Sequence, residues 1–422
     1  MSVTRDLDKS KFPSAYDVPL KDIDVSDGLL FQAQEHFEYF ERLRKEDPVH
    51  YCENSEFGAY WSITKFNDIV AVDTNHKAFS SDKTINIFDP DPEFVLPMFI
   101  AMDQPKHDVQ RKAVVSAVAP VNLAKLESLI RTRVCEILDS LPVGETFDWV
   151  DRVSIELTTQ MLATLFDFPW EDRRKLTHWS DVATARPDEV RPDGSLVADE
   201  DRKRELLECL EYFTKLWSSR DENYEGTDFI SLLATNPDTK QMSSDPMEFL
   251  GNLILLIVGG NDTTRNSISG GVLALNQNPK EYDKLRANPA VIPNMVSEII
   301  RWVTPLGHMR RTALEDVELG GKLIKKGDRV IMWYISGNRD EEVIENANQF
   351  IIDRDKARHH LSFGFGIHRC MGNRVGEMQL RILWEEILKR FEKVEVIGKP
   401  ERMDSNFVMG ITEMQVMLHP LK

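Results

Sequence analysis

A glycine-spaced loop that carries one cysteine and runs directly into a helical pattern constrains this chain more than any other feature. The loop reads Phe363-Gly-Phe-Gly-Ile-His-Arg-Cys-Met-Gly372, and the helical pattern covers residues 375–388. Glycines let a flat ligand approach the backbone closely, and a helix N-terminus favours a cysteine thiolate. The fold is therefore expected to present Cys370 to a ligand or a metal.

Two metals are compatible with Cys370. A haem iron uses a single thiolate, whereas a zinc ion would need further ligands such as His359, His360 and His368. The spacing of these four residues matches no common zinc pattern. The remaining cysteines are widely separated, which predicts small buried hydrophobic residues and no disulfide framework: Cys52, Cys135 and Cys209.

Helical periodicity dominates the chain and predicts a mainly α fold. Apolar stripes at helical spacing cover residues 123–141, 153–166, 204–217, 246–276 and 292–303. Short β-like runs occupy residues 59–64, 317–319, 329–334 and 415–418. These runs indicate a small β-rich subdomain beside a large helical body. No repeat or linker divides the chain, so residues 1–422 are expected to form a single domain.

Charge and hydropathy exclude two classes of protein. The chain has 52 Lys and Arg against 70 Asp and Glu, a net charge of −18, which disfavours nucleic-acid binding. The longest aliphatic run, Leu253–Val258, is far shorter than a bilayer span, and the first ten residues contain no apolar signal. We expect a cytoplasmic protein with no membrane anchor.

The cysteine loop matches a known family signature. Phe363, Gly366, Cys370 and Gly372 fit the pattern F-x-x-G-x-x-x-C-x-G of the cytochromes P-450, so the chain resembles this family. The resemblance implies the single-domain P-450 fold, haem b as cofactor with these residues around it, and Cys370 as the thiolate ligand of its iron. A thiolate ligand favours O–O cleavage over oxygen carriage, and the resemblance implies a monooxygenase.

A second motif, Gly259-Gly-Asn-Asp-Thr-Thr264, lies within the helical pattern 246–276. Two glycines inside a helix cost about 1 kcal/mol each relative to alanine. Close helix packing, a helix cap or a helix opened beside a ligand would each explain that cost. The motif matches the P-450 pattern [AG]-G-x-[DE]-T-[TS], and the resemblance implies that Thr263 hydrogen-bonds dioxygen while Asp262 relays protons.

Two further sets of charged residues fit the same family. The resemblance implies a structural triad of Glu298, Arg301 and Arg354. The E-x-x-R spacing alone is uninformative, because it recurs at Glu41/Arg44 and Glu171/Arg174, where a surface ion pair is the default. Cations must also neutralise the two haem carboxylates, and the resemblance assigns that role to His107, Arg111, Arg311 and His368.

Electrons are expected from NAD(P)H through an external ferredoxin reductase and ferredoxin, because we expect no fused reductase or ferredoxin module. A small acidic iron–sulfur protein would need a basic docking surface. The candidates, which could equally be scattered solvated charges, are Lys106, Arg111, Lys112, Arg369 and Arg374.

Three longer segments, 309–321, 330–340 and 360–370, look like those of the soluble bacterial alkane and fatty-acid terminal hydroxylases. This resemblance implies hydroxylation at the end of a medium-length linear alkane or fatty acid. Hydroxylation of a bulkier terpenoid or steroid is the alternative within enzymes. A haem-based gas or ligand sensor without turnover is the alternative outside them.

The substrate pocket is expected to be an apolar slot. Its predicted lining is Ile87, Phe88, Phe94, Leu96, Met98, Leu255, Leu256, Gly259, Leu306, Met309, Phe407, Val408 and Met409. Two irregular segments, residues 84–97 and 183–199, have the composition of binding loops or exposed connectors. Arg186 and Arg191 in the second are either ligands for a fatty-acid carboxylate or partners of nearby acids. His308 beside this lining has no evident role.

Overall fold

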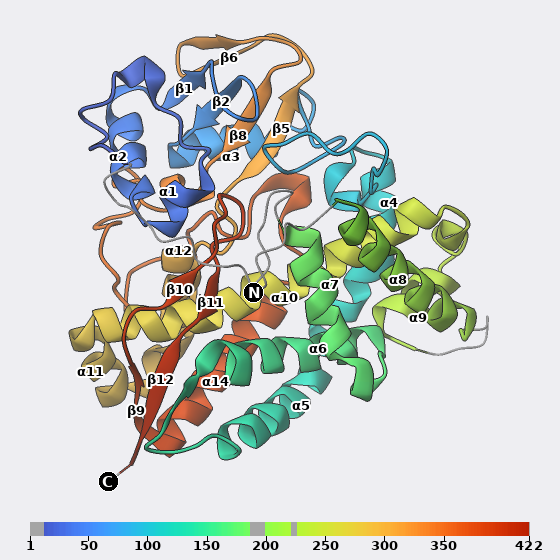
Figure 1. The fold of residues 1–422 in the computed structure, drawn as a ribbon, viewed down its shortest axis with the longest axis vertical. Coiled ribbons are helices and arrows are strands. Elements are labelled where there is room, and N and C mark those ends of the chain that lie inside the picture. Colours follow the sequence, from blue (N-terminus) through green and yellow to red (C-terminus); the bar gives the residue numbers. More distant parts are fainter. Residues whose placement is uncertain (1–11, 186–198, 221–225, 422) are drawn as a thin grey trace.

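The computed structural model describes residues 12–185, 199–220 and 226–421. A large helical body occupies most of the molecule, and a small sheet with helices α1 and α2 lies at one end (Figure 1). The predicted mainly α fold with a β-rich subdomain is confirmed.

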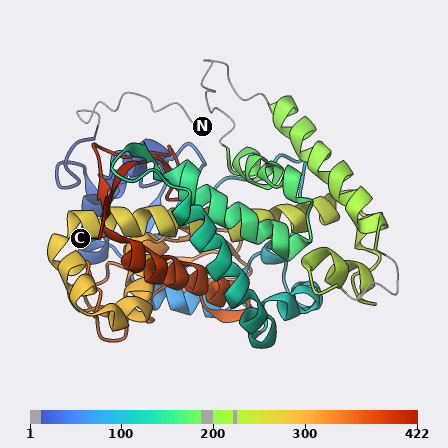
Figure 2. The ribbon, with the colours of Figure 1, turned by 90° about the horizontal axis from the view of Figure 1, so that it is seen from below.

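The central element of the body is helix α10, Pro246–Gln277. It begins where the Asp245 carboxylate accepts a hydrogen bond from the Glu248 N–H at 3.2 Å, with a proline in the first turn. Outside the polar residues 261–267, α10 is apolar around most of its circumference, and helices bury it on several sides (Figure 2). These helices are α6 (Glu156–Phe166), α7 (Arg174–Thr184), α12 (Ile292–Val303) and α14 (Asn373–Arg390).

The other helices cover the body and the sheet. They are α1 (Gly28–Gln32), α2 (His36–Glu46), α3 (Phe66–Thr74), α4 (Lys106–Val115), α5 (Pro120–Asp139), α8 (Asp199–Ser218), α9 (Phe229–Thr235), α11 (Pro279–Ala287) and α13 (Tyr334–Gly337). A π-helical segment at Val150–Ile155 leads into α6, so the predicted helix 153–166 begins with a wider turn. The predicted helix 123–141 corresponds to α5, which ends two residues earlier at Asp139, and the other predicted helices lie within α8, α10, α12 and α14.

The main sheet has the strand order β1-β2-β8-β5-β3. Its strands are β1 (Val49–Cys52), β2 (Tyr60–Ile63), β8 (Arg329–Met332), β5 (Met309–Ala313) and β3 (Phe79–Ser80). β2 and β8 are parallel and the other pairs are antiparallel. The predicted strand 329–334 is shorter than expected because the chain turns into α13 at Tyr334.

Three smaller sheets complete the β structure. They pair β6 (Val317–Leu319) with β7 (Lys322–Ile324), β10 (Glu401–Arg402) with β11 (Ile411–Glu413), and β12 (Gln415–Pro420) with both β4 (Thr146–Asp148) and β9 (Phe391–Val396). The predicted runs 59–64, 317–319 and 415–418 correspond to β2, β6 and β12.

No single helix among the described residues is long and apolar enough to span a bilayer. A bent pair, residues 106–118 and 121–139, reaches that length and apolarity only when its two halves are counted together.

Candidate active site

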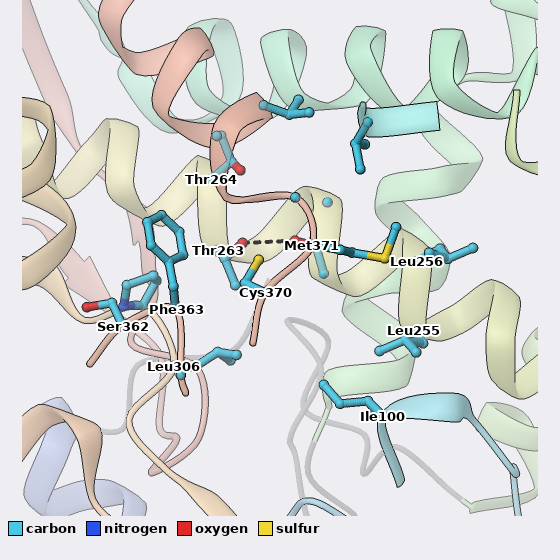
Figure 3. Close-up of a pocket in the computed structure, with 18 of the residues that line it drawn as sticks. Ile100, Leu255, Leu256, Thr263, Thr264, Leu306, Ser362, Phe363, Cys370 and Met371 are labelled. Carbon is cyan, nitrogen blue, oxygen red and sulfur yellow. Dashed lines mark hydrogen bonds between the residues drawn. The ribbon is translucent and has the colours of Figure 1, made fainter. Parts of the chain in front are cut away.

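A large apolar cavity lies between α10 and the loop that precedes α14. Figure 3 shows Thr263 on α10 and Cys370 on that loop, with Leu255, Leu256 and Leu306 around the same space. The empty space between its lining residues, counted together with the open mouth, is about 1500 Å³. Its lining is mostly apolar, as in sites that bind hydrophobic small molecules.

The cysteine loop is shaped by its glycines. Gly364 and Gly366 have φ angles of +64° and +66°, and a Cβ on Gly366 would lie 2.5 Å from the backbone oxygen of Asp73. The loop closes with a hydrogen bond of 2.8 Å from the Cys370 N–H to the Phe363 oxygen. Only glycine accommodates this left-handed backbone and close approach at low cost, and the result is a thiol held at the cavity wall.

Two opposing effects act on the Cys370 thiol. Desolvation raises the pKa of Cys370, whereas the N–H groups of Gly372 and Asn373 and the charge of Arg111 lower it. The backbone donors at the start of α14 thus act as the sequence predicts, and desolvation outweighs them. A positive metal ion at the sulfur would reverse that balance, because metal coordination deprotonates a thiol.

The two glycines of α10 have different surroundings. A Cβ on Gly260 would lie 2.7 Å from Leu162 Cδ2 of α6, so close packing explains this glycine. A Cβ on Gly259 would meet nothing within 4 Å, so this glycine leaves the cavity wall open. The helix is continuous here, and the Thr263 hydroxyl donates to the Gly259 oxygen at 2.9 Å (Figure 3).

Asp262 points away from the cavity, toward α7. Its side chain is fully buried, and its Oδ1 lies 2.8 Å from Arg265 Nη2, which also lies 2.7 Å from Asp181 Oδ1. Burial raises the pKa of Asp262 to about 6, with a further contribution from Asp181, while Arg265 opposes the shift. Its Oδ2 has no hydrogen-bond partner among the described residues.

The predicted triad forms a buried ionic cluster. Arg301 Nε and Nη2 lie 2.7 Å from the two Glu298 oxygens, and Arg354 Nε lies 3.0 Å from Glu298 Oε2. Arg301 also donates to the backbone oxygens of Asn338 and Ala347. The cluster therefore fixes the backbone that precedes the cysteine loop.

The four predicted ligands of the haem carboxylates gather at one side of the cavity. His107 and His368 are in ring contact with centroids 4.3 Å apart, and Arg111 donates to the Arg369 oxygen. His107 Nε2 and both ring nitrogens of His368 are buried and lack partners among the described residues. Of the four, Arg111, Arg311 and His368 line the cavity, and His107 lies behind His368.

These unpartnered nitrogens test whether a haem fits. Burial lowers the pKa of His368 to about 2, with contributions from nearby cations, and also lowers that of His107. Neutral imidazoles keep one N–H donor each. Buried donors that lack partners, next to Arg111 and Arg311, fit a ligand with carboxylate groups.

The zinc alternative is not supported. His360 packs its ring against Phe363, and His359 packs against Phe66. No group of three or more His, Cys, Asp or Glu side chains in the described part of the chain is arranged to hold a metal. Cys370 therefore has no partner ligands of the kind that a zinc site requires.

The structure places only part of the predicted substrate lining at the cavity. Leu255, Leu256, Gly259, Leu306 and Met309 line the cavity as predicted. Eight other residues do not line it, because they pack elsewhere or face solvent: Ile87, Phe88, Phe94, Leu96, Met98, Phe407, Val408 and Met409.

Each of these eight has a structural reason. Ile87 and Met409 pack with the N-terminal cluster around Trp333, while Phe88 is exposed. Val408 pairs with Leu306 through a β-bridge and so supports a lining residue from behind. The others pack on two core clusters: Phe94 and Leu96 on the α4–α10 cluster, and Met98 and Phe407 on the sheet cluster.

The cavity wall that the sequence did not predict comes from segments outside both irregular loops. It includes Phe99, Ile100, Val118, Met161, Leu162 and Leu165. Met161, Leu162 and Leu165 lie at helical spacing on α6, a pattern that a core helix also shows. Only the proximity of α6 to Gly260 places them at the cavity.

The remaining predicted residues are also located. Arg186 and Arg191 lie outside the described residues. His308 is buried against Trp333 and Phe407 and hydrogen-bonds the Asn406 oxygen at 3.0 Å, so it joins β5 to the 403–410 turn.

The basic candidates do not all remain free for docking. Lys106 pairs with Glu248 and Arg111 faces the cavity. Lys112, Arg369 and Arg374 are exposed.

Comparison with known proteins identifies relatives over nearly the whole chain. The family model described as Cytochrome P-450 matches residues 134–418. Linalool 8-monooxygenase of Pseudomonas putida is 34% identical and covers 94% of this chain and 99% of its own length. Steroid C26-monooxygenase of Mycolicibacterium smegmatis is 34% identical and covers 94% of this chain and 93% of its own length. The methyl-branched lipid omega-hydroxylase of Mycobacterium tuberculosis is 31% identical and covers 94% of this chain and 91% of its own length.

Solved structures agree with this assignment. Cytochrome P-450-153 from Novosphingobium aromaticivorans has a TM-score of 0.87 and 46% identity, covering 94% of this chain and 99% of its own. CYP153D17 from Sphingomonas sp. has a TM-score of 0.85 and 47% identity, covering 94% and 98%. The fold, the cysteine loop and the relatives named as monooxygenases all favour an enzyme over a haem-based sensor without turnover. The chain belongs to the cytochrome P-450 family and is a monooxygenase.

Proposed function

We propose that this monooxygenase inserts one atom of dioxygen into the terminal C–H bond of a medium-length alkyl chain, in an alkane or a fatty acid. The observation that carries the proposal is the apolar cavity in which Leu255, Leu256 and Leu306 lie close to Thr263 and Gly259. Support also comes from a relative named as a methyl-branched lipid omega-hydroxylase. A primary C–H bond is stronger than a secondary one, so the wall must present only a chain end to the reacting centre.

The family implies a haem cofactor, and we assign its ligands as follows. Cys370 Sγ would bind the iron, and the glycine loop from Phe363 to Gly372 would let the haem lie against the backbone. Haem iron with a thiolate ligand supplies the activation of dioxygen and the transfer of an oxygen atom. The haem carboxylates would be held by Arg111, Arg311 and His368 at the cavity edge, with His107 behind His368.

Two residues of α10 handle protons in this proposal. The Thr263 hydroxyl lies on the cavity wall, where its Oγ1 can pass a proton to the reacting centre. Asp262 Oδ2 can take up a proton inside the protein near neutral pH, because burial raises its pKa to about 6. Arg265 and Asp181 connect this carboxylate to α7, so the proton source lies on the α7 side of α10.

We propose that electrons come from NAD(P)H through a separate ferredoxin reductase and ferredoxin. The cavity lies directly behind the exposed Arg369 and Arg374, which flank the cysteine in sequence. With Lys112 they offer positive charge on a strongly acidic protein, and this charge suits an acidic iron–sulfur partner.

Hydroxylation of a terpenoid or a steroid is the second candidate. It is favoured by two relatives named as linalool 8-monooxygenase and steroid C26-monooxygenase. The apolar lining of the cavity also suits the hydrocarbon skeleton of a terpenoid or a steroid. A titration over substrates of graded shape distinguishes the candidates.

That titration follows the low-spin to high-spin shift of the Soret band of the purified holoenzyme. Linear alkanes and fatty acids of increasing length are compared with monoterpenes and steroids. We expect a length-dependent shift that peaks at medium chains. A shift with terpenes or steroids alone would replace the proposed substrate class and leave the monooxygenase assignment intact.

Replacing Thr263 by alanine is expected to divert electrons to hydrogen peroxide. Alcohol formed per NADH consumed should fall by about a hundredfold, the lower range for a positioned proton donor, while the substrate-induced Soret shift stays unchanged. Alcohol, peroxide and NADH are measured in the same reaction. Thr263→Ser retains the hydroxyl and should retain coupling, and a coupled Thr263→Ala enzyme would exclude Thr263 from proton delivery.

A further inference from the structure

Asp73, the penultimate residue of α3, is a buried carboxylate that the sequence did not single out. Its side chain is 1% exposed. Oδ1 lies 2.7 Å from Arg311 Nη2, and Oδ2 accepts from the Tyr334 hydroxyl at 2.9 Å and from the Phe365 N–H at 2.7 Å. One carboxylate thus joins a cavity-lining arginine, a cavity-lining tyrosine and the cysteine loop.

The cysteine loop is built around this residue. A Cβ on Gly364 would lie 3.3 Å from Asp73 Oδ2, and one on Gly366 would lie 2.5 Å from the Asp73 backbone oxygen. Both glycines have positive φ angles. The loop that carries Cys370 therefore rests directly on Asp73, and its position depends on the hydrogen bond from the Phe365 N–H.

Two guanidinium nitrogens of Arg311 have hydrogen-bond partners, and the side chain also faces the cavity. Nη2 binds Asp73, and Nη1 donates to the Arg310 backbone oxygen at 2.8 Å. An arginine has five N–H donors, and Arg311 also lines the cavity. Its remaining donors can reach a carboxylate in the cavity, while Asp73 cancels its charge from behind.

Tyr334 remains a donor to this carboxylate. Burial raises the pKa of Tyr334 well above its ordinary value, and Asp73 adds to the shift. The hydroxyl is thus neutral and partly compensates the negative charge of Asp73. Removing Asp73 eliminates a negative charge, whereas removing the Tyr334 hydroxyl leaves that charge in place with one hydrogen-bond donor fewer.

We propose that Asp73, supported by Tyr334, is a positioning residue for the haem: it orients Arg311 toward a haem carboxylate and sets the electrostatic field at the iron. The proposal rests on the haem site proposed above. It predicts that the reduction potential of the holoenzyme responds to Asp73, although Asp73 itself lies behind Arg311.

Asp73→Asn is the direct test. The amide has nearly the same size but lacks the charge, so Arg311 becomes an uncompensated cation beside the haem and the reduction potential should rise. Haem transfer to apomyoglobin should accelerate by about tenfold, the lower range for loss of an outer-shell partner. Potential is measured by spectroelectrochemistry, and transfer by the change in absorbance.

Two further variants make the test specific. Asp68→Asn removes the same charge from the same helix, at a half-buried site near Lys65 and not among the residues that line the cavity, and should leave the potential unchanged. Tyr334→Phe removes a hydroxyl dipole that partly compensates the Asp73 carboxylate and leaves its negative charge in place, so the potential should fall. Opposite shifts at Asp73 and Tyr334 are not expected from a loss of packing.

The outcomes are separable. Equal potentials in wild type and Asp73→Asn, or equal shifts in Asp73→Asn and Asp68→Asn, would overturn the inference. If Asp73→Asn retains no haem, Tyr334→Phe decides, because an unchanged potential there also overturns it. A wild-type protein that binds no haem would instead overturn the proposed function.

Discussion

Replacing Cys370 by serine is expected to abolish product formation and the absorption band of the reduced, carbon monoxide-bound protein that reports a thiolate ligand. Serine matches cysteine in shape, so the Cys370 N–H to Phe363 hydrogen bond and the glycine turns of the loop can persist. A hydroxyl is a much weaker donor to iron than a thiolate. The chemistry should therefore fail while the fold survives.

The chain provides a matched control for this variant. Cys135 is half-buried on α5, and its thiol donates to Glu386 at 3.5 Å. Cys135→Ser preserves a donor there and should keep the wild-type spectrum. A retained thiolate spectrum in Cys370→Ser, or its loss in Cys135→Ser, would contradict the assignment of the iron ligand.

Glu298→Gln is expected to destabilise the protein most. The carboxylate accepts from Arg301, Arg354 and the Ile351 N–H at 2.8 Å, and all three charged side chains are buried. Glutamine would leave two buried guanidinium groups without a counter-charge, at a cost of about 3–5 kcal/mol. That loss is a large fraction of a typical unfolding free energy of roughly 5–15 kcal/mol.

The same E-x-x-R spacing elsewhere supplies the control. Glu41 is 43% exposed and pairs with Lys45, whereas Arg44 turns inward to Ser336. Glu41→Gln should change the unfolding free energy by less than about 0.5 kcal/mol. Urea denaturation followed by far-ultraviolet circular dichroism measures both variants. Similar small changes in both would exclude the structural role of the Glu298 cluster.

The sequence predicted the elements that periodicity or fixed spacing determines. The apolar stripe at 246–276 yields α10 because a nearly continuous apolar surface must be buried by other helices. Cys370 was accessible for a different reason, because its motif fixes several residue types at short spacings. The Glu298 cluster followed from the family resemblance, because the E-x-x-R spacing alone recurs elsewhere in the chain.

The sequence did not predict features that depend on tertiary contacts. Asp73, Arg311, Tyr334 and Phe365 are far apart in the chain and meet only because α3, β5 and the cysteine loop pack together. The residues of the cavity wall also depend on tertiary contacts. The 84–97 loop was expected to line it, but α6 approaches instead because Gly260 leaves room for Leu162.

The central claim is terminal hydroxylation with dioxygen as the oxygen source. It is tested by turning over a medium-length linear alkane under isotopically labelled dioxygen, with a surrogate ferredoxin, its reductase and NADH, and by identifying the product by mass spectrometry. The account predicts a primary alcohol that carries one labelled oxygen atom. Subterminal alcohols, or NADH consumption without any labelled alcohol from linear substrates, would contradict it.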